Sequence, residues 1–73
     1  MKTEEDFLIV YKGKEVKVTS VLDEANIHFI VHFAKDIIIA EEMVNGEWKW
    51  NEKDRGETDL SIELGEIIDQ MEI

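Results

Sequence analysis

The chain has 73 residues and no cysteine, so it can form neither a disulfide framework nor a thiolate zinc site. A hydrophobic core alone must hold the fold, and we expect no cofactor. The length allows one domain, spanning residues 1–73. A domain of this size buries only about 60 % of the surface that its unfolded chain exposes, so a partner subunit would add useful stability.

Basic residues are scarce, with 8 lysines and arginines against 18 aspartates and glutamates and a net charge of −10. This balance argues against nucleic acid and anionic membranes as partners, because both are bound through clustered basic side chains. The segment from Asp59 to Ile73 contains no base at all. It predicts either a solvated helix face or an acidic surface offered to a basic partner.

Long apolar runs are also missing, and no segment approaches the roughly 18 residues of a membrane span. The first six residues lack the basic start and apolar stretch of a signal peptide. We therefore predict a cytoplasmic protein, with a secreted protein whose signal has been removed as the alternative.

Asn45-Gly46 is the strongest local signal, because this dipeptide between alternating segments is typical of a type I′ hairpin turn. A two-residue turn here places Val44 opposite Glu47 and Met43 opposite Trp48. Trp48 and Trp50 then share one side of the hairpin.

Three further predicted turns determine, toward the N-terminus, which residues of neighbouring strands lie opposite each other. We expect them at Gly13-Lys14, at 23–26 and at 34–36, the last being the weakest because it has no glycine. The predicted pairs are Tyr11 with Val16, Ile9 with Val18, Leu22 with Ile27, Val18 with Val31, Val16 with Phe33, Phe33 with Ile37 and Val31 with Ile39. Every turn keeps the apolar residues on one side.

The result is a five-stranded antiparallel meander with one apolar core face. Its predicted members are Phe7, Ile9, Tyr11, Val16, Val18, Leu22, Ile27, Phe29, Val31, Phe33, Ile37, Ile39, Met43, Trp48 and Trp50. The aromatic side chains of both tryptophans are therefore expected in the core rather than in a binding platform.

After a polar loop at 51–57, the hydrophobic period changes to that of an α-helix. Its apolar stripe is formed by Leu60, Leu64, Ile67, Ile68 and Met71, and Thr58 or Asp59 is the expected N-cap. Gly65 inside this helix either weakens the helix or permits a close approach to the sheet, and we favour the close approach. The fold class is α+β, in the order β-β-β-β-β-α, with the helix packed on one face.

The opposite side of the sheet, which we term the second face, is also partly apolar. It carries Leu8, Val10, Val21, Ile30, Ala34, Ile38, Ala40 and Val44. Sheet curling, the 51–57 loop or a second copy of the chain could cover it, and we favour the second copy. The predicted interaction surface comprises Leu8, Val10, His28, Ile30, His32, Ile38 and Ala40.

The two histidines have the spacing of a helical zinc pair, but they fall in a strand, where residues four apart are separated by roughly 13 Å. We expect ordinary polar positions on the second face. A pH-sensitive interface and a metal site shared between two copies are the alternatives.

Groups that could support catalysis do not converge. Glu41 and Glu42 point to opposite faces of a strand, with Glu41 expected at the sheet margin opposite Trp50. The acidic residues between Asn51 and Asp59 lack the ligand spacing of a calcium-binding EF-hand. We predict that the protein is not an enzyme and binds no metal.

In its order of parts, a strand meander, a Gly-x-Trp-x-Trp hairpin arm formed by Gly46, Trp48 and Trp50, and a closing helix, the chain resembles short uncharacterised bacterial proteins. The resemblance implies the fold and no known activity. The predicted function is a non-enzymatic association module that homodimerises through the second face. The alternative is an acidic inhibitor or immunity-type protein that binds a basic partner.

Overall fold

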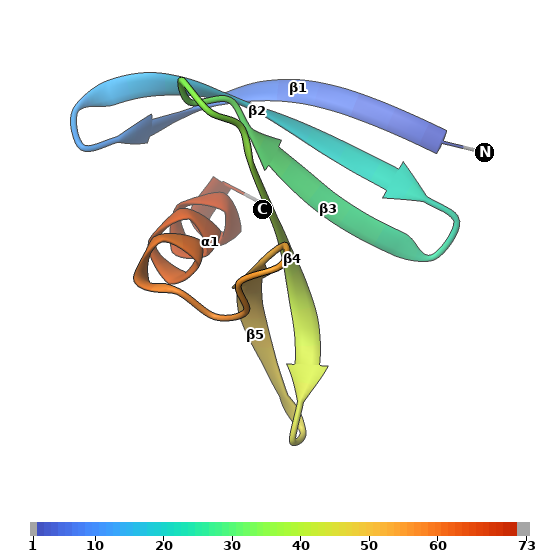
Figure 1. Cartoon of the computed structure of the whole chain (residues 1–73). Coiled ribbons are helices and arrows are strands. Elements are labelled where there is room, and N and C mark those ends of the chain that lie inside the picture. Colours follow the sequence, from blue (N-terminus) through green and yellow to red (C-terminus); the bar gives the residue numbers. More distant parts are fainter. Residues whose placement is uncertain (1, 72–73) are drawn as a thin grey trace.

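Five antiparallel strands and one C-terminal helix make up the computed structural model, which describes residues 2–71 (Figure 1). The elements are β1 (Lys2–Tyr11), β2 (Lys14–Asp23), β3 (Asn26–Val31), β4 (Ile37–Val44), β5 (Glu47–Glu52) and α1 (Asp59–Met71). The strands lie side by side in the order of the chain. The predicted α+β meander is confirmed.

The β4–β5 hairpin has the predicted register, with Val44 opposite Glu47 and Met43 opposite Trp48. Asn45 and Gly46 both adopt positive φ angles, of 50° and 82°. A type I′ turn requires this conformation at both of its central residues, and asparagine and glycine adopt it at the least cost.

The β1–β2 turn lies one residue earlier than predicted. Its central residues are Lys12 and Gly13, with φ angles of 51° and 79°, so that Ile9 lies opposite Val16 rather than Val18. The glycine takes the second central position, as it does in Asn45-Gly46. The register shifts by two residues, and because side chains alternate with a period of two, every side chain keeps its predicted face.

The β2–β3 register is confirmed, but the β3–β4 register is not. Val31 lies opposite Ile37, and Phe29 lies opposite Ile39. The connection spans residues 32–36, and none of them has a positive φ angle. Without a residue that readily adopts the left-handed conformation, the chain makes a wider connection than the predicted loop at 34–36.

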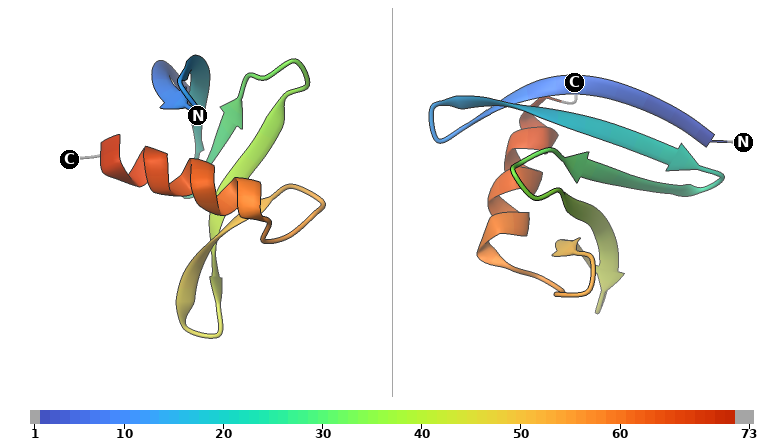
Figure 2. Two further views of the ribbon diagram at one scale, coloured as in Figure 1. Left: turned by 90° about the vertical axis from the view of Figure 1, so that its left-hand side faces the viewer. Right: turned by 45° about the horizontal axis from the view of Figure 1, so that its top comes forward.

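The helix packs on one face of the twisted sheet and contacts β1, β4 and β5 (Figure 2). Between them lies the hydrophobic core, which consists of Ile9, Val16, Val18, Phe29, Val31, Ile39, Trp50, Leu64 and Ile68. The rings of Phe29 and Trp50 lie 5.6 Å apart between their centroids.

Four residues predicted for the core are exposed instead: Leu22, Ile27, Met43 and Trp48. The 13-residue helix is about 20 Å long, whereas a 10-residue strand extends over about 33 Å. The β2–β3 and β4–β5 hairpins therefore project beyond the area that the helix covers (Figure 1). Trp50 is buried as predicted, but Trp48 is 64 % exposed.

The helix begins with a reciprocal cap. Of the two predicted N-cap residues, Thr58 takes the capping position and Asp59 is the first residue of the helix. The backbone N–H of Ser61 donates to Thr58 Oγ1 at 3.0 Å, and the backbone N–H of Thr58 donates to Ser61 Oγ at 3.0 Å. The buried Ser61 hydroxyl also donates to the carbonyl oxygen of Trp50 at 2.8 Å. This contact anchors the start of the helix to β5.

Gly65 lies directly against the indole ring of Trp50. A Cβ atom at this position would lie 2.2 Å from Trp50 Cγ, far inside van der Waals contact. The predicted close approach is confirmed, and it explains why the helix tolerates a residue that costs about 1 kcal/mol relative to alanine.

We expect Gly65→Ala to destabilise the protein, although the same change at an exposed helical site stabilises it. The helix-propensity gain is about 1 kcal/mol, and overpacking against Trp50 costs roughly 1–3 kcal/mol or more. Urea unfolding should therefore show a lower free energy of unfolding. A stabilised variant would contradict the packing described here.

Two controls identify the cause. Glu66→Ala, at an exposed position of the same helix, should change the free energy of unfolding by no more than about 0.5 kcal/mol. In a Trp50→Leu background the cost of Gly65→Ala should fall, because the side chain that meets the new methyl group is smaller.

Candidate functional site

The predicted interaction surface falls into two groups on the second face. Leu8 and Val10 lie together on the edge strand β1 and are 54 % and 63 % exposed. Ile30 lies opposite Ile38, and Ala40 follows Ile38 on the same face of β4. The members of this second group are only half-buried. The exposed apolar part of the surface is therefore the pair on β1.

Parts of the second face are already covered within a single chain. Val21 is 1 % exposed, lying between Glu4 on β1 and His28 on β3. On the β4–β5 side of the sheet, the backbone N–H of Lys53 donates to the carbonyl oxygen of Ile38 at 2.9 Å. The segment after β5 thus contributes to the wall of a hollow of about 280 Å³, lined by His28, Ile38, Ile39, Ala40, Glu42, Asn51 and Lys53.

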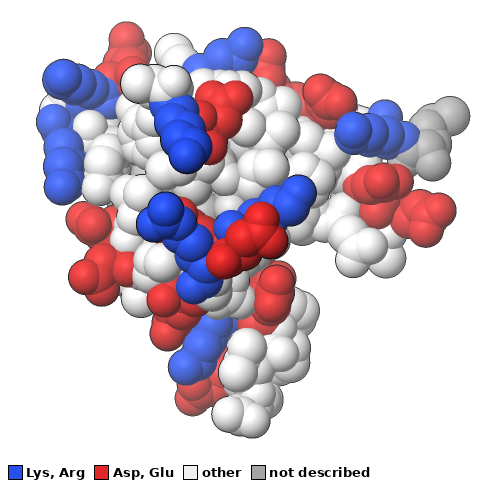
Figure 3. Space-filling model, in the orientation of Figure 1, with Lys and Arg blue, Asp and Glu red and all other residues white. Residues whose placement is uncertain are grey.

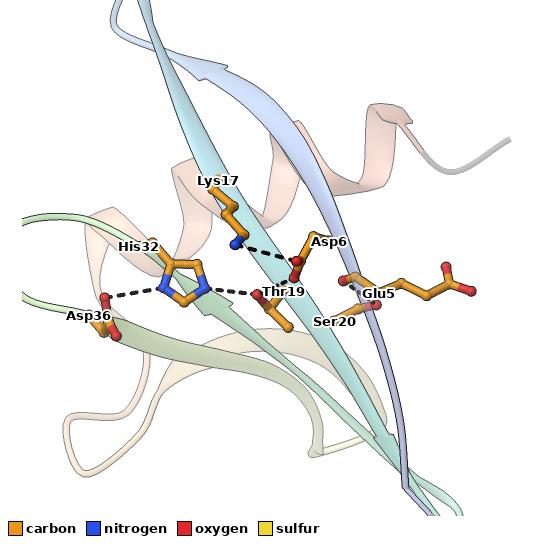
Figure 4. Close-up of polar contacts among 7 residues, drawn as sticks. All are labelled: Glu5, Asp6, Lys17, Thr19, Ser20, His32 and Asp36. Atoms are coloured by element: carbon orange, nitrogen blue, oxygen red, sulfur yellow. Dashed lines mark hydrogen bonds and ion pairs between the residues drawn. The ribbon is translucent and has the colours of Figure 1, made fainter.

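A network of polar side chains lies between the two apolar groups, because Leu8 lies opposite Lys17 and Ile30 lies opposite Thr19. Figure 4 shows the members of this network. Thr19 Oγ1 donates to Asp6 Oδ1 at 2.7 Å and lies 2.8 Å from His32 Nε2. His32 Nδ1 lies 3.3 Å from Asp36 Oδ1, and Lys17 Nζ lies 3.4 Å from Asp6 Oδ2. The network joins β1, β2 and the β3–β4 connection.

The number of available protons determines how this network is connected. Thr19 has one hydroxyl proton, which it gives to Asp6, so the Thr19–His32 contact requires an N–H on His32 Nε2. A proton on Nδ1 as well completes the contact with Asp36. All of these contacts are therefore satisfied together when the imidazole is doubly protonated.

The hydrogen bond from Thr19 lowers the pKa of the Asp6 carboxyl, and Lys17 and His32 contribute in the same direction. Partial desolvation of Asp6 opposes this shift. A carboxyl whose pKa is lower in the folded than in the unfolded protein stabilises the fold above its unfolded pKa. This stabilisation is lost as the pH falls through the folded pKa.

Asp36, His32 and Thr19 are aligned like an acid, base and hydroxyl set, but their hydrogen bonds do not suit nucleophilic catalysis. A nucleophilic hydroxyl must give its proton to the imidazole, whereas Thr19 gives its proton to Asp6. Thr19 is also only 7 % exposed. The arrangement suits the holding of two strands and a loop in place.

The other candidate residues lie apart from this network. His28 lines the hollow beside Ile38, so the two histidines have different surroundings. Glu41 lies opposite Trp50 and is exposed at the sheet margin, as predicted. Within residues 2–71 there is no group of three or more side chains suited to holding a metal ion.

The pairing of Asp6 with Thr19 was missed because the predicted β1–β2 register placed Leu8 opposite Thr19. In the structure Asp6 takes that position. The sequence signal that identifies the pair is the glycine of Lys12-Gly13. A glycine in the second central position of the turn fixes the observed register.

Comparison of the chain with known protein families, curated proteins and solved structures finds no match. Among the described residues 2–71, no helix is both long enough and apolar enough to cross a membrane. The resemblance to short bacterial proteins stays a prediction.

We expect Thr19→Val to raise the pKa of Asp6 toward its ordinary value of 3.8, because the variant loses the hydroxyl donor. The variant should then lose less stability than the wild type as the pH falls below that value. Carboxyl-carbon NMR titration measures the pKa, and urea unfolding across the acid range measures the stability.

Ser20→Ala is the matched control, since the Ser20 hydroxyl donates to the Glu5 carbonyl oxygen and does not contact Asp6. Its Asp6 pKa should equal that of the wild type. An unshifted pKa in Thr19→Val would show that the hydroxyl is not the cause.

Proposed function

We propose that the protein is a non-enzymatic association module whose copies dimerise through the second face of the sheet. The observation that carries this proposal is the exposure of Leu8 and Val10, adjacent on one face of the edge strand. Transfer of such a side chain out of water is worth roughly 1.5–3 kcal/mol. Two copies bring four of these side chains to one interface.

The surroundings of this pair suit a self-complementary contact. Leu8 lies opposite Lys17 and Val10 lies opposite Glu15, so charges of both signs border the apolar centre. A two-fold axis brings the same patch of both copies together. A border of a single charge sign would therefore meet like charges and be repelled, whereas a border of both signs can pair opposite charges.

The alternative function, inhibition of a basic partner, is supported by the outward side of α1. Asp59, Glu63 and Glu66 are all exposed there. The two functions respond oppositely to salt. Two copies that each carry a net charge of −10 repel one another, so salt strengthens their association, whereas salt weakens binding to a basic partner.

Light scattering coupled to size-exclusion chromatography should therefore detect a dimer of the wild-type protein at tens of micromolar, favoured when the salt concentration is raised. Leu8→Glu should shift the protein to the monomer, because it places a charge of the same sign on both sides of the contact. A wild-type protein that stays monomeric at every salt concentration would rule out self-association.

Leu22→Glu is the matched control. Leu22 is an exposed leucine of the same sheet, but it lies on the other face. The variant adds the same charge and should dimerise like the wild type. If both variants became monomeric to the same extent, added charge rather than the position of Leu8 would be the cause.

A further inference from the structure

The outer edge of β1 is an unusual feature of this small sheet. β1 is a 10-residue strand at the edge of the sheet, and within residues 2–71 no strand pairs with its outer side. Edge strands are usually protected by charge, proline, bulges or short length. Residues 7–11 are Phe-Leu-Ile-Val-Tyr and have none of these protections.

The β1–β2 turn determines which backbone groups point outward. A two-residue turn at Lys12-Gly13 makes Tyr11 and Lys14 a hydrogen-bonded pair, and such pairs alternate along an antiparallel ladder. Ile9 therefore bonds to β2, while Leu8 and Val10 direct their N–H and C=O groups outward. The residues with exposed side chains also present unpaired backbone groups at the edge.

We propose that a second copy of the chain occupies this edge, with the two β1 strands antiparallel about a two-fold axis at Ile9. This inference rests on the self-association proposed above and places the contact at the β1 border of the second face, along the edge of the sheet, rather than over the centre of that face. Leu8 of each copy then lies opposite Val10 of the other, and their outward backbone groups form hydrogen bonds. The two sheets become one continuous sheet, and the four exposed side chains gather on its second face.

The order of charges along the chain favours this axis. The first half of β1 carries Glu4, Glu5 and Asp6. The turn that follows the strand is basic, and its blue side chains gather at the left of Figure 3. With the axis at Ile9, Asp6 of each copy comes to lie beside Lys12, in the turn that follows β1 of the other copy. Opposite charges therefore meet at both ends of the shared ladder.

The neighbouring registers lack this match. An axis at Leu8 places Val10 opposite Asp6, and an axis at Val10 places Leu8 opposite Lys12. Each puts an apolar side chain against a charge. Only the axis at Ile9 pairs apolar residues with one another while it pairs acids with bases.

Disulfide cross-linking tests this register directly, because the protein has no cysteine of its own. Opposite residues of a hydrogen-bonded pair have Cα atoms about 5.5 Å apart, within the range of about 4.4–6.8 Å that a disulfide spans. Leu8→Cys and Val10→Cys are prepared separately and mixed. Mass spectrometry then distinguishes the mixed disulfide from either symmetric one.

We expect the mixed disulfide to form at least about ten-fold faster than either symmetric one, because only Leu8 and Val10 lie directly opposite each other. Leu22→Cys, on the other face, serves as the control and should not form cross-links. Faster symmetric cross-linking of Leu8→Cys would place the axis at Leu8. Faster symmetric cross-linking of Val10→Cys would place it at Val10, and either result overturns the proposed register.

The failure of this geometry is distinguishable from the failure of the proposed function. A wild-type dimer in light scattering together with cysteine variants that form no disulfide would overturn edge pairing and leave self-association standing. A monomeric wild type would overturn both.

Discussion

The contact between Trp50 and the backbone of Gly65 determines how the helix and sheet fit together. The indole leaves no space for a Cβ atom at Gly65, so the backbone of the helix rests directly on the indole ring. Two further contacts fix the Trp50 side chain. The Phe29 ring packs against its indole, and its Nε1 donates to Asp69 Oδ2 on α1 at 3.3 Å. With the bond from Ser61 to the Trp50 carbonyl oxygen, these contacts fix the position of α1 across the sheet.

This fixed position explains which apolar surface remains outside the core. The helix covers the middle of one face, so the ends of the β2–β3 and β4–β5 hairpins stay exposed, including Trp48. In the described part of the chain, residues 2–71, no helix packs on the second face, and the Asp6–Thr19–His32 network occupies its centre. Each chain thus covers its second face only in part. Leu8 and Val10 remain exposed because they lie beyond this network, on the outermost strand.

Much of the fold was predictable because the decisive signals are local. Asn45-Gly46 fixed one register, and alternation assigned side chains to their faces even where a turn was misplaced, since both register errors were of two residues. Gly65 indicated a close helix–sheet contact. The extent of the area that the helix covers was not predictable, because it depends on how the helix lies across the sheet. The Asp6–Thr19 pair was missed because it depends on the exact position of one turn.

The same charge order that selects the proposed axis also disfavours other modes of edge pairing. Parallel pairing of two β1 strands would place acidic halves side by side and lysines against lysines, which like-charge repulsion opposes. Growth beyond two copies would require the other edge of the sheet, at β5. That strand has only six residues, alternates tryptophan with charged Glu47 and Lys49, and is followed by a turn closed by the Glu52–Gly56 bridge. A long apolar edge at one side and a short charged edge at the other therefore favour a closed pair over an open chain of sheets.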